Sequence, residues 1–525
     1  MRNGSPTSHA PEEGHPQRWL ILGILCTCLV LVVAAVSSLN IAIPSIQEAL
    51  DATQTELQWI VDAYALVFAG LLLPAGALGD RFGRKLTLLF GLALFGVAAV
   101  VASYADSATQ VIVMRSVMGV GAAFIMPSTL SLLTSVFPPH ERGKAIAVWA
   151  GFAGAGGAIG VLASGVLLEH YWWGSVFLIT VPIVAVAMVA IFAIVPNSKD
   201  HEGHPLDPIG TLLSIIGLVS LVFAIIEGPE RGWGSSVVVG GFVLAVIALG
   251  AFVLWETRTQ HPMLDPTFFR LRRFSVSATT ITIVFFVMFA MFFGLSQYLQ
   301  FVRDYSPLKT GLATLPSAAT MIIVAPRGPL VQQRITVRRT IALGLSLVAL
   351  GSLLFTFLDA ESDYWLVCLA LVVLAAGAGL ATPSATTGIM SSLPMNKAGV
   401  GSAVNDTTRE VGGAVGIAVI GSVLASVYRG NVDDATAMLP PGAAEAAHDN
   451  VGAATTIGMD VLGGDPSALE RYLGIIGDAF TDGFNAGMGV AAAAALLGAL
   501  AVLRWYPKDA GMPLRPPTAE AAAQH

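Results

Sequence analysis

The chain has 525 residues, of which 55% are hydrophobic and 12% charged, and its mean hydropathy is +0.74. These values lie far above those of soluble domains, so the soluble classes of protein are excluded. The formal net charge of -7 reflects the chemistry of the loops and gives no reason to expect a nucleic-acid partner.

Apolar runs of about 20 residues recur along the chain, and each is long enough to cross roughly 30 Å of hydrocarbon as a helix. About fourteen runs meet this criterion, which predicts an all-α integral membrane protein. The first run leads into SSLNIAIPSI without a small-residue cleavage site, so we expect a retained span and not a signal peptide. The runs start near residues 19, 57, 86, 108, 143, 174, 209, 236, 275, 308, 340, 364, 401 and 482.

The basic residues predict the orientation of these spans. With the first tail in the cytoplasm, most of the 27 lysines and arginines fall in inner loops and termini. We therefore expect both tails, residues 1–17 and 507–525, to be cytoplasmic, in agreement with an even number of spans. The largest inner clusters are Arg81, Arg84 and Lys85; Arg270, Arg272 and Arg273; and Arg334, Arg338 and Arg339.

The second span carries a carboxylate, Asp62, within the sequence LQWIVDAYALVF. Residues 53–56 read TQTE, a capping-box pattern, which makes Asp62 the ninth helical residue, roughly 13 Å along the axis. An ionised Asp near the centre of a span costs roughly 2.5–3.5 kcal/mol. Asp62 is either a tolerated boundary acid or, as we expect, a group that faces a water-filled cavity.

Three neighbours of Asp62 are candidate ligand contacts. Trp59 and Tyr64 flank it on the same helix, either as interfacial anchors or as aromatic surfaces for a cationic ligand. Asn40 lies about as far from the end of the first helix as Asp62 lies from the start of the second. The two side chains are therefore expected to share a depth and a hydrogen bond.

Between the second and third spans, residues 76–88 read GALGDRFGRKLTL. Gly79 and Gly83 allow close backbone approach, and Asp80 can pair with Arg84 or lie at the N-terminus of a neighbouring helix. This turn resembles the signature of the major facilitator superfamily, G-x-L-x-D-R-x-G-R-K, and the resemblance implies that it holds one conformational state. The matching residues are Gly76, Leu78, Asp80, Arg81, Gly83, Arg84 and Lys85.

The resemblance extends over nearly the whole chain. RSVMGVGAA, at residues 115–123, is similar to the fourth-helix motif of the family and places Arg115 inside a span. QWIVDAYALVFAGLL resembles the drug:proton antiporters of the QacA and EmrB type, and the QacA branch has an acid at the position of Asp62. Residues 206–210 and 227–233 resemble the extra helix pair of fourteen-helix exporters, and residues 398–422 resemble their thirteenth-helix signature.

What the resemblance implies is a major facilitator fold with two six-helix halves, residues 18–196 and 274–506, and a helix pair inserted within residues 197–273. It also implies a proton-coupled multidrug exporter of lipophilic, cationic compounds in a bacterial-type cytoplasmic membrane, with Asp62 and Arg115 in proton coupling. The expected partners are drug-like small molecules, protons and membrane lipids. We expect a monomer that uses the proton motive force and needs no metal or cofactor.

Several positions depart from the family pattern. Ala35 stands where an acid is usual in the first helix, and the fifth-helix motif reads GVLASG, with Val161 in place of Pro. Gly156, Gly160 and Ser164 still form a small-residue stripe, which indicates either ordinary tight packing or a gating role. The second half keeps a degenerate copy of the basic turn at residues 330–339, where Gln332 stands near the expected Asp.

The ninth span offers further candidate contacts, Phe289, Phe293 and Gln297, at helical spacing. The two Phe residues are packed, face lipid or line a binding wall, and the Gln needs a polar partner in lipid. The acidic segment at residues 430–481 is predicted to be a long outer loop, either a solvated cap or a negative collar for cations.

Alternative functions remain on the same fold. An exporter of a specific antibiotic, lipid or metabolite, or an importer, differs only in what it carries and in which direction. A membrane enzyme needs His, Cys or acidic residues clustered at one depth, and the nine histidines form no such cluster in the sequence. The sequence therefore favours a transporter over an enzyme.

Overall fold

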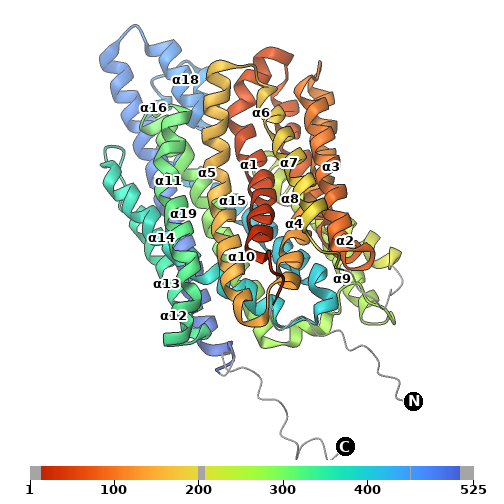
Figure 1. Cartoon of the computed structure of the whole chain (residues 1–525). Coiled ribbons are helices and arrows are strands. Elements are labelled where there is room, and N and C mark those ends of the chain that lie inside the picture. The colour runs from red at the N-terminus through yellow and green to blue at the C-terminus, as the bar shows by residue number, and fades with distance from the viewer. Residues whose placement is uncertain (1–13, 199–206, 450, 509–525) are drawn as a thin grey trace, which may run out of the picture.

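The computed structural model describes residues 14–198, 207–449 and 451–508, and every regular element in these ranges is helical (Figure 1). Fourteen helices in the described part of the chain are long and apolar enough to cross a membrane. This confirms the predicted all-α membrane fold. Helices suit this role because they satisfy their own backbone hydrogen bonds where no water is present.

The first six spans form one bundle around a continuous apolar core that runs from Ile21 to Val195. The predicted capping box is present, since the Thr53 side chain accepts from the Glu56 amide and the Glu56 carboxylate accepts from the Thr53 amide. The helices are α1 (Arg18–Leu50), α2 (Gln54–Phe82), α3 (Arg84–Ser103), α4 (Ala108–Val136), α5 (Pro139–His170), α6 (Ser175–Leu178) and α7 (Thr180–Ile194).

Two helices follow as an antiparallel pair, α8 (Pro208–Arg231) and α9 (Ser236–Glu256), which pack against each other. Helix α8 also contacts α2 and α15, whereas much of the apolar surface of α9 is exposed. The pair is therefore attached along α8. A short 3-10 helix, η1 (Pro266–Arg270), leads on to the next bundle.

The remaining six spans form a second bundle with its own apolar core. Its first helix ends in one turn of π-helix, η2 (Tyr298–Val302). The other elements are α10 (Arg272–Gln297), α11 (Pro307–Val324), η3 (Ala325–Arg327), α12 (Gly328–Ile335), α13 (Val337–Phe355), α14 (Tyr364–Met390), η4 (Met395–Lys397), α15 (Ala398–Asn431) and α19 (Pro466–Trp505).

The acidic segment predicted as a loop is largely helical. It contains α16 (Asp433–Thr436), α17 (Pro441–Asp449) and α18 (Val451–Leu462), and α19 begins at Pro466, well before residue 482. Two buried tyrosines tie these short helices to the long helices on either side. Tyr428 of α15 donates to the Ala447 carbonyl of α17, and Tyr472 of α19 donates to the Ala454 carbonyl of α18, each at 3.0 Å. Figure 1 shows α16 and α18 at the end of the molecule opposite to α12.

Small residues allow close helix packing in both bundles. A Cβ atom on Gly160 would lie 2.4 Å from the Ala34 carbonyl oxygen, so α5 and α1 touch through their backbones. A Cβ atom on Gly416 would lie 2.2 Å from the Phe286 carbonyl oxygen, which places α15 equally close to α10. The small-residue stripes therefore serve tight packing in this structure.

Candidate functional site

The basic turn between α2 and α3 is tight because one residue, Gly83, ends one helix and starts the next. Its φ of 109° lies in the region that favours glycine. Next to it, Arg84 donates from Nε and Nη2 to Asp80 Oδ1 at 3.0 and 2.8 Å. Both side chains are buried, so this ion pair lies in a region of low dielectric and depends on additional hydrogen bonds.

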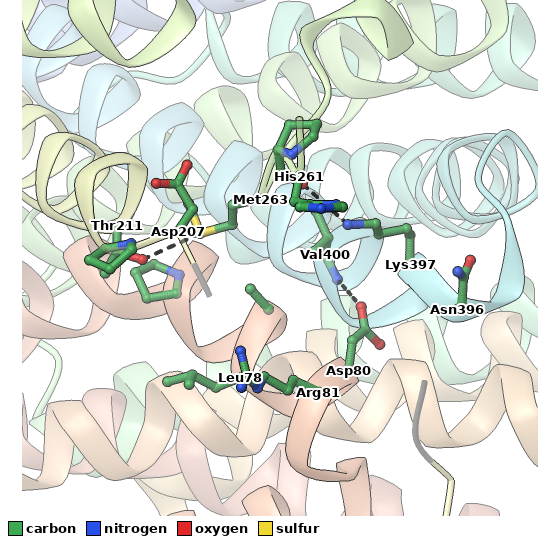
Figure 2. A pocket seen from close by; sticks show the side chains of 14 residues that line it. Leu78, Asp80, Arg81, Asp207, Thr211, His261, Met263, Asn396, Lys397 and Val400 are labelled. Carbon is green, nitrogen blue, oxygen red and sulfur yellow. Dashed lines mark hydrogen bonds between the residues drawn. The ribbon is translucent and has the colours of Figure 1, made fainter. Parts of the chain in front are cut away.

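Those additional bonds come from the other bundle. The Gly399 amide donates to Asp80 Oδ1 at 2.8 Å. The Val400 amide donates to Asp80 Oδ2 at 3.1 Å, the bond drawn in Figure 2. Asp80 therefore accepts from the N-terminus of α15. Arg84 Nη2 also donates to the Met395 carbonyl at 2.7 Å. The sequence predicted either an ion pair with Arg84 or a helix N-terminus as the partner of Asp80, and in the structure Asp80 has both.

We call this contact the Asp80 clamp, and it comprises Asp80, Arg84, Met395, Gly399 and Val400. It joins the two six-helix halves at the end of the molecule that carries the basic turn, which we call the basic end. While these bonds are intact, the halves are held together at this end.

Two glycines make the clamp possible. A Cβ atom on Gly76 would lie 2.6 Å from the Gly399 carbonyl oxygen, and a Cβ atom on Gly399 would lie 2.5 Å from the Gly76 carbonyl oxygen. Helices α2 and α15 therefore meet backbone to backbone, at a glycine for which no packing prediction was made from the sequence. A side chain at either position would push the helices apart.

The other basic residues of the turn make separate contacts. Lys85 donates to the Phe192 carbonyl at 2.8 Å, which ties the start of α3 to the end of α7. The Arg81 guanidinium lies 5.5 Å from the Phe82 ring centroid, and Arg81 lines the cavity drawn in Figure 2. The structure therefore places Arg84 in the clamp and Arg81 and Lys85 beside it.

A second cluster lies between α2 and α4. The Arg115 guanidinium is fully buried, 4.3 Å from the centroid of the Tyr64 ring, and its Nε donates to the Ile60 carbonyl at 3.0 Å. Its Nη1 and Nη2 atoms and the Tyr64 hydroxyl have no hydrogen-bond partner within the described ranges. A buried guanidinium with free donors is costly, and such residues within spans indicate a functional site.

The candidates around Asp62 are not all brought together. Asp62 is half-buried on α2 and Tyr64 faces Arg115, but Trp59 packs in an apolar cluster with Leu66 of α2 and Val222 of α8. Trp59 therefore lies toward the inserted pair. Asn40 belongs to α1, and its side chain is outside the described part of the structure, so its expected bond to Asp62 stays a prediction.

Sequence reasoning missed a third cluster, on α15, although its charged residues lie in AVNDTTREVGG, at residues 403–413 of the thirteenth-helix segment 398–422. Thr386 donates to Asn405, and the Asn405 amide donates to Asp406 Oδ1 at 3.2 Å. The Arg409 guanidinium lies between two rings, 4.7 Å from the Trp149 centroid and 4.8 Å from the Phe285 centroid. The signal that could have found this cluster is three charged residues within one span.

This third cluster connects the two halves. Trp149 belongs to α5 of the first half, while Phe285 and Arg409 belong to the second. Glu410 lies within electrostatic range of Tyr64 on α2, and α15 packs against both α2 and α4. Carboxylates of the second half and guanidinium groups of both halves therefore lie near the contact between them. Such groups can exchange a proton or bind a cation as the halves move.

The three candidates of the ninth span, Phe289, Phe293 and Gln297, all lie on α10. Phe289 packs on Gly413 of α15, and Phe293 is exposed near Gly421. Gln297 donates to the Phe293 carbonyl of its own helix at 3.4 Å. None of these contacts reaches the Arg115 cluster, and a role for the three residues in ligand binding stays a prediction.

The chain is similar to known proteins over nearly its whole length. A family model described as Major Facilitator Superfamily matches residues 25–417. The "Multidrug efflux pump LfrA" of Mycolicibacterium smegmatis is 35% identical over 95% of this chain and 98% of the relative. The "Tetracenomycin C resistance and export protein" of Streptomyces glaucescens is 32% identical over 95% of this chain and 94% of the relative.

A solved structure agrees in fold. The human organic anion transporter MFSD10 (TETRAN) matches with a TM-score of 0.62 over 93% of this chain and all of that chain. The sequence identity of this match is 14%, so it bears on the fold alone.

Proposed function

The chain belongs to the Major Facilitator Superfamily, and from this premise we propose that it exports lipophilic, cationic drug-like compounds in exchange for protons. The observation that carries the export proposal is the similarity, over 94% or more of both chains, to relatives named for multidrug efflux and for drug resistance and export. The observation that supports proton coupling is the set of acidic and basic side chains inside the spans.

We propose Asp62 as the main proton carrier. A carboxylate that binds a proton in one state and a cationic substrate in another makes the two compete, which is the requirement for exchange. Asp406 and Glu410 are additional carboxylates in the second half, and each half also has a buried cation, Arg115 in the first and Arg409 in the second. The membrane potential adds about 2.3 kcal/mol per charge moved for each 100 mV.

The proposed mechanism is alternating access between the two six-helix halves. The Asp80 clamp closes the basic end, which we propose to be the cytoplasmic face of a bacterial-type cytoplasmic membrane. Both chain termini then lie in the cytoplasm. The protein acts as a monomer among membrane lipids, driven by the proton motive force without a metal or cofactor.

The test is ethidium efflux from cells with and without a proton uncoupler. Asp62→Asn should abolish uphill efflux while the protein is still inserted, and Asp62→Glu should retain part of it. The matched control is Asp482→Asn, because Asp482 is an exposed carboxylate on α19. Uncoupler-sensitive efflux at the parental rate in Asp62→Asn would contradict the role of Asp62, and no ethidium efflux by the parent would contradict multidrug export.

A second candidate is the export of one specific antibiotic. It is favoured by the similarity to a relative that is named for resistance to a single compound, tetracenomycin C. A panel of structurally unrelated toxic compounds separates the two candidates. Resistance to several of them indicates a multidrug exporter, and resistance to a single compound indicates the specific exporter.

A further inference from the structure

The inserted helix pair carries two acidic residues at the basic end that the proposed transport mechanism does not use. Asp207 is the N-cap of α8, and Glu256 is the last residue of α9. The Glu256 side chain is 2% exposed, although it lies at a helix end where solvent would normally reach a carboxylate. A buried carboxylate needs compensation by hydrogen bonds, a counter-ion or a proton.

The two carboxyl groups meet above Gly210. A Cβ atom on Gly210 would lie 2.4 Å from Asp207 Oδ2 and 2.5 Å from Glu256 Oε1. The two oxygens are therefore within about 5 Å of each other. Glu256 is buried and Asp207 is half-buried, and at this separation two such carboxylates cannot easily both be ionised.

The hydrogen bonds of the pair leave one oxygen without a donor. Asp207 Oδ1 accepts from the Gly210 amide at 2.9 Å, and both Asp207 oxygens lie 2.9 Å from the Trp255 indole nitrogen. Glu256 Oε2 accepts from the Leu264 amide at 3.3 Å. Glu256 Oε1 has no hydrogen-bond partner within the described ranges, and it is the oxygen that faces Asp207.

The charged groups on neighbouring elements do not replace the missing donor. Lys397 acts on Glu256 electrostatically, but its ammonium group donates to the Pro262 carbonyl at 3.2 Å (Figure 2). Asp207, His261 and Lys397 line a cavity of about 290 Å³, and Asp80 and Arg81 line its other wall. This cavity gives Asp207 a path to solvent.

We propose that Asp207 and Glu256 share one proton, and that this proton fastens the segment after α9 to the inserted helix pair. With the proton in place, one carboxyl group donates to the other, and Glu256 Oε2 holds the Leu264 amide. Release of the proton to solvent in the cavity leaves two like charges side by side. The pair then separates, and the bond to Leu264 is lost.

Such a site gives the basic end a response to pH that does not require a transported substrate. The cavity beside Asp207 is also lined by Asp80 and Val400 of the clamp. Movement of the inserted pair therefore alters the space next to the contact between the halves. The inference goes beyond drug export and holds whether or not the chain exports ethidium.

The test measures hydrogen exchange of the full-length protein in detergent, in peptides that cover residues 257–271, between pH 6 and pH 9. Rates are corrected for the intrinsic effect of pH. In the closed state the Asp207–Glu256 pair is intact and holds the proton, and in the open state the pair has separated and the proton is released. The equilibrium constant for opening should therefore rise about tenfold per pH unit. In Glu256→Gln, whose amide donates in place of the proton, this dependence should disappear.

A second variant and a matched control keep the test decisive. Asp207→Asn also supplies a donor and remains a good N-cap, so it should remove the pH dependence as well. Glu227→Gln is the control, because Glu227 is equally buried on α8 but pairs with Arg231 away from this site. The proposal is overturned by a wild-type opening constant that does not change with pH, or by an unchanged slope in both amide variants. Protection that depends on added Mg²⁺ and not on pH would overturn it in favour of a metal ion.

Discussion

The two halves of the molecule have the same turn between their second and third spans, but only the turn of the first half forms the Asp80 clamp with the other half. At Gly83 the first half has a φ of 109°, and at Thr336 the second half has a φ of 80°. In both, the amide of the turn residue donates to the carbonyl four residues earlier, Gly79 or Gln332. The same backbone geometry therefore separates α2 from α3 and α12 from α13.

The likeness continues along the following helices. Eight residues beyond each turn lies a glycine, Gly91 or Gly344, that meets a glycine of the next helix, Gly121 or Gly377. In each pair a Cβ atom on either residue would lie 2.4–2.8 Å from the partner's carbonyl oxygen. Contacts within a half are thus repeated.

The contact between the halves is not repeated. Counted from the turn residue, the position of Asp80 is taken by Gln333, which is exposed, and the position of Arg84 is taken by Val337. Gln332, which the sequence placed near the expected Asp, instead donates to Ser384 within its own half at 2.7 Å. The backbone turn is therefore common to both halves, whereas the Asp80 clamp occurs in the first half only.

The largest expected effect follows from removing the charge of the clamp. Asp80→Asn leaves Arg84 buried without its counter-ion, so the closed basic end is destabilised and efflux should fall by about 10- to 100-fold. Gln333→Ala is the matched control in the second half and should leave efflux unchanged. Initial efflux rates at equal membrane abundance test this, and equal losses in both variants would contradict the comparison.

The repeated glycine contacts predict equal effects in the two halves. Gly91→Ala and Gly344→Ala each force a methyl group into a backbone contact, so each should cost about 1–3 kcal/mol of stability. The measurement is the thermal unfolding temperature in detergent. A fall in only one variant would show that the two halves are not equivalent in packing.

Substitutions at the two turn residues, Gly83 and Thr336, should change the stability of the protein in opposite directions. Gly83→Ala places a Cβ atom at a positive φ and should destabilise the protein by about 1–2 kcal/mol. Thr336→Gly relieves a β-branched residue of the same strain and should stabilise it by up to about 1 kcal/mol, less the entropy that glycine adds to the unfolded chain. Unfolding temperatures that move in the same direction would contradict this assignment.

The smallest effect is expected where a carboxylate is added to the second half. Gln333→Asp restores the residue type of Asp80, but position 333 is exposed, so stability should change by no more than about 0.5 kcal/mol. Efflux should also be unchanged. A gain or loss of efflux would show that this turn approaches the first half in another state of the cycle.

Sequence reasoning predicted the fourteen spans because bilayer thickness sets a length that apolar runs display directly. It predicted the partners of Asp80 because a buried carboxylate has few ways to be compensated. It missed the α15 cluster because partners of its charged residues come from other helices, as Trp149 of α5 and Phe285 of α10 do for Arg409. It also predicted a loop over residues 430–481, where short helices gain their stability from tertiary contacts such as the Tyr472 bond.

Residue contacts across helices were harder to predict. The periodicity of α2 did not show that Trp59 lies toward α8 while Tyr64 lies toward α4, since the side of each neighbour depends on how the inserted pair docks. The Asp207–Glu256 pair was missed for the same reason. Its members are far apart in sequence, and only the antiparallel packing of α8 and α9 brings them together.

The Asp80 clamp also makes the transport cycle sensitive to osmotic conditions. In the closed form the Asp80 carboxylate and the amides of Gly399 and Val400 are buried against one another. When α2 and α15 separate, each of these groups has to be hydrated, so opening takes up water from the solvent. Solutes that are excluded from protein surfaces oppose such hydration. With the basic end at the cytoplasmic face, as proposed above, a cell that accumulates osmolytes would hold this face shut for longer, with no change in proton or substrate gradients.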